Sequence, residues 1–109
     1  MKIAIPVENN DENTSMDNRF GRSLYYAIYD SDKDSFEFLK NPASQARGGA
    51  GVQAVEFIIK NGAKAVIVPQ LGPNADHALK TSGITIFQGT KEPIKKLVEM
   101  WKSGNLNKL

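Results

Sequence analysis

The chain has 109 residues, of which 40% are hydrophobic and 24% charged, and its formal net charge is +2. This length suits a single domain over residues 1–109, and so small a net charge does not favour nucleic acid as a ligand. The chain has no cysteine and one histidine, His77. These counts exclude disulfides, thiol nucleophiles, a Cys/His zinc site within one chain and a four-cysteine iron–sulfur site.

The sequence carries no sign of membrane insertion or secretion. No apolar run approaches the roughly 20 residues that a membrane-spanning helix needs. The first residues, MKIAIPVENN, break at Pro6 and then turn polar, so we expect no secretory signal. We therefore expect a cytoplasmic protein that does not bind membranes.

The first half of the chain predicts strands and two polar loops. Alternating or β-rich apolar residues predict strands over residues 2–7, 24–30 and 35–40. The turn at 31–34 makes the last two strands an antiparallel hairpin. Residues 8–23 form a polar loop whose length is typical of functional loops. A second loop, at 41–51, ends in Gly48-Gly49-Ala50-Gly51.

The second half alternates helices with strands. Helical apolar spacing predicts a helix over 52–61, and a nearly continuous apolar run predicts a buried strand over 64–69. A short helix then opens at 71–74 and runs to about residue 81, followed by a strand over 84–87. The last helix carries four residues on one apolar face: Ile94, Leu97, Val98 and Trp101. The polar tail from about Ser103 is expected to be frayed.

This order of elements predicts the α/β class. Strands joined by helices pair in parallel through right-handed crossovers, whereas the hairpin makes the second strand antiparallel. We expect a three-layer α/β/α sandwich around a five-stranded mixed sheet. In that topology four loops meet at one edge of the sheet, at 8–23, 41–51, 70–74 and 88–90. Open α/β sheets bind ligands beyond the carboxyl ends of their strands, so this edge is the expected binding region.

The first candidate binding segment is Arg19-Phe20-Gly21-Arg22, which follows Asp17 in the long loop. Two guanidinium groups could hold an anion there, and Gly21 would let the backbone turn or approach a ligand closely. The alternative is that Phe20 fills the core while the arginines form ion pairs with nearby carboxylates: Asp11, Glu12 or Asp17.

The other two candidate segments lie at predicted helix starts. Arg47-Gly48-Gly49-Ala50-Gly51 leads into a helix whose first N–H groups could bind an anion, although the segment lacks both the phosphate-loop motif and the strand that precedes a dinucleotide fingerprint. The alternative is a flexible connection that needs its glycines. Gly72-Pro73-Asn74 starts the next helix at the same edge. His77 in that helix is a candidate metal ligand, but a lone histidine is more often a surface or packing residue.

Motifs for catalysis are missing. The chain has no Ser/His/Asp ordering and no Gly-x-Ser-x-Gly turn, and its first strand carries no carboxylate of the kind a metal-dependent nuclease needs. The acid–base candidates near the edge are Glu8, Asp17 and His77. A small enzyme that acts on an anionic metabolite stays one alternative.

Four blocks of this sequence resemble the dinitrogenase iron–molybdenum cofactor biosynthesis family, which includes the NifX and NifY carriers and the C-terminal part of NifB. The blocks are MKIAIPVE, DNRFGRSLYYAIYD, GGAGVQAVEFIIKNGAKAVIVPQLGPNA and the GI-x-IFQG at 83–89, which together span residues 1–90. The resemblance implies a ribonuclease H-like three-layer fold. It also implies non-enzymatic binding or carriage of an iron–sulfur or iron–molybdenum-type cluster at the edge described above.

The sequence departs from one form of the family pattern. Relatives often carry histidine directly before Phe-Gly, where this chain has Arg19. Because the chain also lacks cysteine, an anionic cluster or related oxyanion would be held electrostatically by arginines and helix N-termini. The implied partner is a protein that donates or accepts the cluster, and the expected state is a monomer or weak homodimer. A regulatory or scaffold module is the alternative, which exposed Phe20, Tyr25 or Tyr26 would favour.

Overall fold

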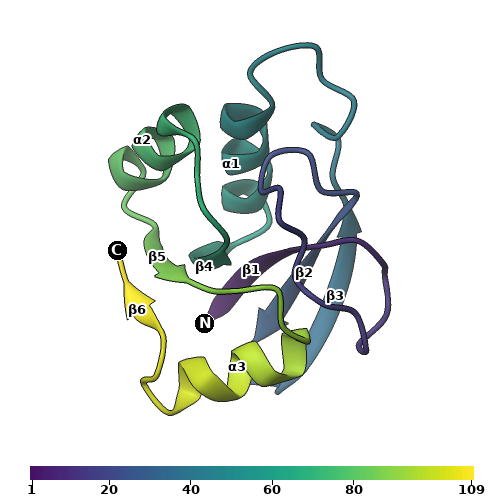
Figure 1. Ribbon diagram of the computed structural model, residues 1–109, viewed down its shortest axis with the longest axis vertical. Coiled ribbons are helices and arrows are strands. Elements are labelled where there is room, and N and C mark those ends of the chain that lie inside the picture. The colour runs from purple at the N-terminus through teal and green to yellow at the C-terminus, as the bar shows by residue number, and fades with distance from the viewer.

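A computed structural model describes residues 1–109 as a six-stranded mixed sheet with three helices (Figure 1). The strands are β1 (Lys2–Val7), β2 (Tyr25–Asp30), β3 (Ser35–Lys40), β4 (Ala63–Val68), β5 (Thr85–Gln88) and β6 (Asn107–Lys108). The helices are α1 (Ala50–Lys60), α2 (Pro73–Thr81) and α3 (Ile94–Lys102). None of the helices has the length and apolar character that crossing a membrane requires.

The order of strands across the sheet is β3-β2-β1-β4-β5-β6. β1 pairs with β4 and β4 pairs with β5 in parallel, and α2 supplies the crossover that the second of these parallel pairs requires. β2 is antiparallel to both β1 and β3. The α/β class and the antiparallel second strand are therefore confirmed, while the ribonuclease H-like relationship stays a prediction.

The expected number of five strands is wrong, because the tail contributes a sixth. After α3 the chain turns back, and β6 pairs antiparallel with the outer side of β5. The Leu109 N–H donates to the Ile86 carbonyl oxygen over 2.8 Å. The expectation of a frayed tail from Ser103 is wrong for the same reason. The outer side of β5 offers unpaired backbone groups, which a polar segment can use without any apolar pattern of its own.

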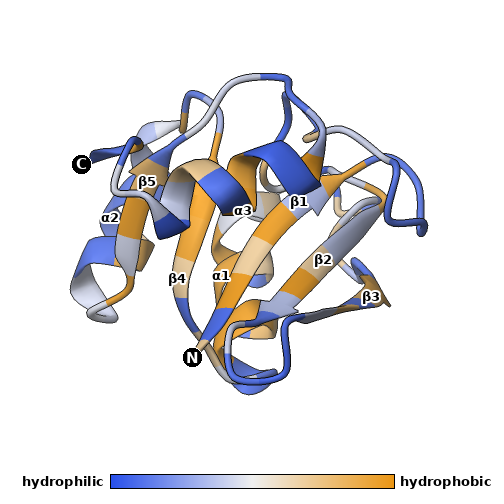
Figure 2. Ribbon diagram, turned by 90° about the horizontal axis from the view of Figure 1, so that it is seen from below, coloured by the Kyte–Doolittle hydropathy of each residue, from blue (hydrophilic) through white to orange (hydrophobic).

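Helices lie on both faces of the sheet (Figure 1). Along β4, Val66 and Val68 join the hydrophobic cluster under α1 and α2, whereas Ala65 and Ile67 join the cluster under α3. This arrangement explains why the sequence of β4 is a nearly continuous apolar run. Figure 2 shows apolar residues along the central strands and, in front of them, α3 with alternating hydrophobic and hydrophilic residues.

Most predicted elements agree with the structure to within one or two residues. The main difference is α1, which begins at Ala50 and not at Val52. Gly49 takes a left-handed backbone with a φ of 68°, which ends the preceding loop immediately before the helix. The N-terminus of α1 therefore starts within the glycine-rich segment itself.

The loop at 8–23 is anchored in its middle. Met16 forms an isolated bridge with Val7 and is fully buried among residues that pack under α3. The Ile94 N–H donates to the Thr14 carbonyl oxygen over 3.0 Å, so the loop is also joined to the start of α3. These contacts fix the point from which the following segment, 17–23, reaches the edge of the sheet.

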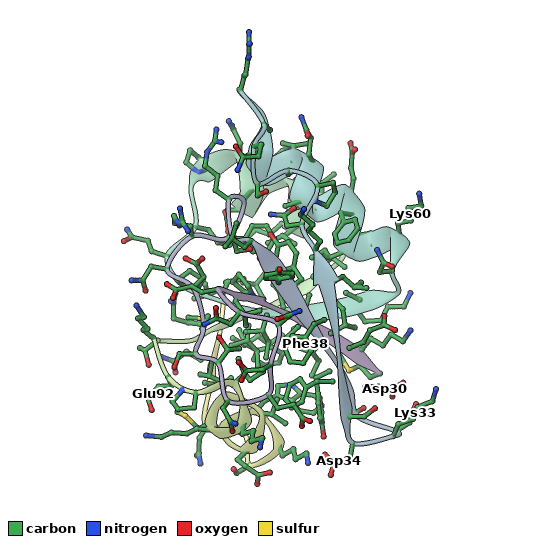
Figure 3. All side chains as sticks on the ribbon, turned by 90° about the vertical axis from the view of Figure 1, so that its right-hand side faces the viewer. Asp30, Lys33, Asp34, Phe38, Lys60 and Glu92 are labelled. Atoms are coloured by element: carbon green, nitrogen blue, oxygen red, sulfur yellow. The ribbon has the colours of Figure 1, made fainter.

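At the other end of the sheet, α3 is joined to the turn between β2 and β3, where Figure 3 labels Asp34. The Asp34 carboxylate accepts hydrogen bonds from the Tyr29 hydroxyl and, over 3.1 Å, from Lys102 Nζ. These two donors favour the ionised form and hold the pKa of Asp34 below its ordinary value.

We expect Asp34 to make the free energy of unfolding depend on pH in acid. Because the folded-state pKa of Asp34 is lowered, its contribution is complete above the ordinary aspartate pKa of about 3.9 and is lost as pH falls through the folded-state value. Asp34→Asn keeps a residue that tolerates the backbone φ of 50°. Urea titrations from pH 7 to pH 3 should show this variant less stable at neutral pH, with the difference shrinking in acid. Equal stability of Asp34→Asn and wild type at neutral pH, with Glu37→Gln as the exposed control, would contradict the prediction.

Candidate functional site

A cavity of about 330 Å³ lies at the predicted edge of the sheet. Three segments form its walls: the loop after β1, the start of α1 and the start of α2. Most of the predicted binding residues line it, namely Arg19, Phe20, Gly21, Arg22, Gly49, Gly51, Gly72, Pro73 and Asn74. The topology thus brings together segments that are far apart in the sequence, as the strand order predicts.

Three predicted site residues do not line the cavity. Arg47 and Gly48 are exposed in the loop that precedes α1. His77 is exposed on α2, where its Nε2 lies 3.4 Å from Thr81 Oγ1. These three residues are therefore not among those that would contact a ligand in the cavity. No group of three or more His, Cys, Asp or Glu side chains forms around His77 to hold a metal ion.

The two helices that open on the cavity have no side-chain caps. Gly49 and Gly72 occupy the N-cap positions, and neither position makes a side-chain capping hydrogen bond. The first intrahelical bonds run from Gln53 N–H to Gly49 and from Asp76 N–H to Gly72, over 3.0 and 3.1 Å. Backbone N–H groups before these bonds have no intrahelical acceptor, so both helix starts present donors and partial positive charge at the cavity.

Close backbone contacts join the three walls. A Cβ atom added to Gly21 would lie 2.8 Å from Gly51 N and 2.9 Å from Gly51 Cα. A Cβ atom added to Gly51 would in turn lie 3.1 Å from Ala75 Cβ on α2. The loop can approach α1 this closely only because Gly21 lacks a side chain, and the lack of a side chain at Gly51 helps α1 to pack tightly against α2.

Arg19 forms an ion pair with Asp17 at the cavity rim. Arg19 Nη2 lies 3.3 Å from Asp17 Oδ2, Arg19 Nε donates to Asp17 Oδ1 over 3.3 Å, and the Arg19 backbone N–H donates to the same oxygen over 2.9 Å. These hydrogen bonds and the charge of Asp17 raise the pKa of Arg19, which stays protonated in any case. The pairing of an arginine with Asp17 was the alternative that the sequence left open, and it holds for Arg19.

Arg22 has a different partner. Its Nη1 donates to the Ala46 carbonyl oxygen over 2.6 Å and makes no ion pair with a carboxylate. A carbonyl oxygen leaves the charge of the guanidinium uncompensated, and the other guanidinium N–H groups have no protein acceptor. Arg22 is therefore the arginine of this cavity whose charge is available to a ligand.

Asn41 holds the backbone of residues 21–23 beside the cavity, a role that the sequence analysis missed. Its side chain is 1% exposed, and its Nδ2 donates to the carbonyl oxygens of Gly21 and Ser23 over 3.0 and 2.9 Å. Its Oδ1 accepts the Ala43 N–H over 2.9 Å. The one available signal was the Asn-Pro pair after a strand, which is typical of a turn that the asparagine side chain closes.

The aromatic residues near the cavity are mostly buried. Phe20 is 4% exposed and Tyr26 is fully buried, with the Tyr26 hydroxyl donating to the Phe20 carbonyl oxygen. Burial raises the pKa of Tyr26 well above its ordinary value, so the hydroxyl stays protonated and remains a donor. Phe20 thus fills the core, as the alternative interpretation of its segment held, while its neighbours still line the cavity.

The chemistry of this cavity suits an anion. Its donors are backbone N–H groups and guanidinium groups, and no group of three or more His, Cys, Asp or Glu side chains is placed to hold a metal ion. The acid–base candidates have other partners, since Asp17 pairs with Arg19 and Glu8 lies 3.7 Å from Lys91 Nζ. The residues present fit an anion that brings its own charge and do not fit direct coordination of a bare metal.

The fold and the cavity define a small α/β domain in which two uncapped helix N-termini and two arginines line one edge of a mixed sheet. The chain belongs to the dinitrogenase iron–molybdenum cofactor family, whose model matches residues 1–104. This match confirms the family resemblance found in the four sequence blocks.

Individual proteins match this chain over almost its whole length. An uncharacterized protein from Methanocaldococcus jannaschii is 28% identical over 111 residues, covering 99% of this chain and 91% of that relative. The apo form of the orange protein from Desulfovibrio gigas superposes with a TM-score of 0.94 at 25% identity, covering 99% of this chain and 92% of the other. A candidate NifB protein from Thermotoga superposes with a TM-score of 0.86 at 26% identity, again covering 99% and 92%.

Proposed function

We propose that this protein binds and carries an anionic metal–sulfur cluster of the iron–sulfur or iron–molybdenum type, or a related oxyanion, without catalysing a reaction. The observation that carries the proposal is the convergence of two uncapped helix N-termini with Arg19 and Arg22 on one cavity. Membership of the dinitrogenase iron–molybdenum cofactor family supports a cluster as the cargo.

Electrostatics and hydrogen bonds would hold this cargo. Each helix N-terminus acts as about half a positive charge, and its free N–H groups donate to an anion without any side chain. Arg22 adds a full charge and several donors. Because no protein atom forms a covalent bond to the cluster, its release to an acceptor protein would require only the exchange of these contacts. Such binding weakens with rising salt.

The positions of the acid–base candidates support binding over catalysis. Asp17 forms an ion pair with Arg19, Glu8 lies beside Lys91, and His77 lies outside the cavity. The burial of Phe20 and Tyr26 also removes two of the exposed aromatic residues that a protein-binding module would use at this edge. A donor or acceptor of the cluster stays the proposed partner.

The proposal predicts that two arginine substitutions together strongly weaken cargo binding. Purified protein is titrated anaerobically with tetrathiomolybdate, a coloured metal–sulfur dianion, and binding is followed by absorption and by equilibrium dialysis. Wild type should bind it, and Arg19→Ala combined with Arg22→Ala should lower the affinity by at least about 10-fold, since a charge-assisted hydrogen bond from Arg22 contributes about 1.5–3 kcal/mol and the loss of Arg19 leaves the negative charge of Asp17 unpaired.

A matched control removes the same charge elsewhere. Lys33 lies in the turn between β2 and β3 and Lys60 lies at the end of α1 (Figure 3), and neither lines the cavity. Lys33→Ala combined with Lys60→Ala should therefore leave binding within about threefold of wild type. Normal tetrathiomolybdate binding by a folded double arginine variant would overturn the site, and no binding by wild type would count against the proposed function.

A further inference from the structure

We propose that Asp17 is a positioning residue that fixes Arg19 at the cavity rim and cancels its charge, so that the site presents about two positive charges, and not three, to an anion. This inference rests on the proposed function, because it names the charge of the cargo that the same cavity takes. It assigns different roles to two arginines that are alike in sequence. Arg22 would bind the anion, while Arg19 would shape and close the rim.

The geometry of the pair supports the positioning role. Asp17 is 2% exposed, whereas Arg19 is 61% exposed, so a buried carboxylate holds a guanidinium that lies largely in solvent. All three donors on Asp17 come from Arg19, namely its backbone N–H, Nε and Nη2. If the guanidinium swung away toward a ligand, the buried carboxylate would keep only the backbone N–H, which is costly. Arg19 should therefore stay in place when a ligand binds.

Backbone contacts fix the position of Asp17 in the fold. The Asp17 N–H donates to the Pro6 carbonyl oxygen over 2.8 Å, which joins the residue to the end of β1. Met16, the preceding residue, is fully buried and bridges Val7. Asp17 is thus attached to β1, and the Arg19 guanidinium that it binds is held in a fixed position relative to that strand.

The charges at the cavity then add up to a value that suits a dianion. Arg19 and Asp17 cancel, and Arg22 contributes one positive charge without a carboxylate partner. The N-termini of α1 and α2 contribute about half a charge each, and Asp76 in the first turn of α2 is paired with Lys80 over 3.1 Å, which gives a sum of about +2. With Asp17 neutral the sum would be about +3, so this one carboxylate sets the charge that a ligand must balance.

The test uses two tetrahedral metal–sulfur anions of the same shape but different charge. Tetrathiomolybdate carries two negative charges and tetrathioperrhenate carries one. We expect wild type to bind the dianion more tightly. Asp17→Asn should raise the ratio of dianion to monoanion affinity by about threefold, because the uncompensated charge of Arg19 attracts a dianion about twice as strongly as a monoanion. The ratio separates charge from any general loss of order, which would weaken both anions alike.

A second measurement needs no ligand. In the free protein, the Arg19 Nε–H should exchange slowly with water and give a resolved NMR signal, because Asp17 accepts its hydrogen bond. In Asp17→Asn this signal should broaden or exchange faster. Glu12→Gln is the matched control, since it removes one negative charge from the same loop but no hydrogen bond to Arg19, whose acceptor is Asp17. It should leave both the affinity ratio and the Arg19 signal unchanged.

The outcomes separate the inference from the proposed function. If wild type binds tetrathiomolybdate but Asp17→Asn changes neither the affinity ratio nor the Arg19 Nε–H signal, the role of Asp17 is overturned and the proposed function stands. An equal change in Glu12→Gln would also overturn it, because net charge alone would then explain the result. If neither wild type nor Asp17→Asn binds tetrathiomolybdate, the proposed function fails, and the inference fails with it.

Discussion

Replacing Gly21 by alanine is expected to lower the free energy of unfolding by about 1–3 kcal/mol and to weaken tetrathiomolybdate binding. The added Cβ would lie 2.8 Å from Gly51 N and 3.1 Å from the carbonyl carbon of Ala50, both backbone atoms in the first turn of α1. Backbone in a helix cannot move aside as a flexible side chain can. The loop must therefore move away from α1, which displaces Arg22 and opens the cavity.

Gly72→Ala is the matched control for this change. A Cβ atom at Gly72 would meet nothing within 4 Å, and its φ of −72° suits any residue. Gly21 and Gly72 both line the cavity, so the two variants differ only in whether the added Cβ atom clashes with backbone. Urea denaturation and tetrathiomolybdate titration of both variants test the prediction. If Gly21→Ala is as stable as wild type and binds equally well, the close contact between the loop and α1 does not exist in solution.

Replacing Asn41 by alanine is expected to destabilise the protein by about 3 kcal/mol, because it leaves three polar groups without partners. The carbonyl oxygens of Gly21 and Ser23 lose their donor, and the Ala43 N–H loses its acceptor. The site is 1% exposed, so water has little access to replace these hydrogen bonds. The loss should also loosen the segment that carries Arg22 and thereby weaken tetrathiomolybdate binding.

Asn10→Ala serves as the control for Asn41→Ala. Asn10 is exposed in the loop after β1 and makes no side-chain hydrogen bond with the rest of the protein, so its loss should change stability by no more than about 0.5 kcal/mol. Chemical denaturation measures both variants. A cost below about 1 kcal/mol for Asn41→Ala would show that the three hydrogen bonds are replaced or were weak.

The fold was largely predictable because its signals are local. Apolar alternation located the hairpin strands, and the continuous apolar run located the central strand β4, which is covered on both faces. β6 escaped prediction because its two residues, Asn107 and Lys108, are polar and exposed. Its pairing depends on the free side of β5, which exists only once the sheet has formed.

The candidate site was predictable in its location but not in the roles of its residues. Topology places the starts of α1 and α2 at the same edge, so Gly49 and Gly72 were expected to lie near each other. The sequence offers Asp11, Glu12 and Asp17 as possible partners of either arginine, and residue order alone does not decide that Arg19 takes Asp17 while Arg22 takes none. Asn41 likewise could not be assigned, because its partners Gly21 and Ser23 lie 20 and 18 residues away.

The amino-acid sequence by itself determined the α/β class, the edge at which glycine-rich helix starts and arginines gather, and the family to which the chain belongs. These properties follow from residue type, spacing and order along the chain. Only the tertiary structure decided that Asp17 neutralises Arg19, that Arg22 keeps its charge and that Arg47 and His77 lie outside the cavity. The physical reason is that charge compensation depends on distances of a few ångströms between side chains, and those distances are set by the folded loop and its neighbours and not by residue order alone.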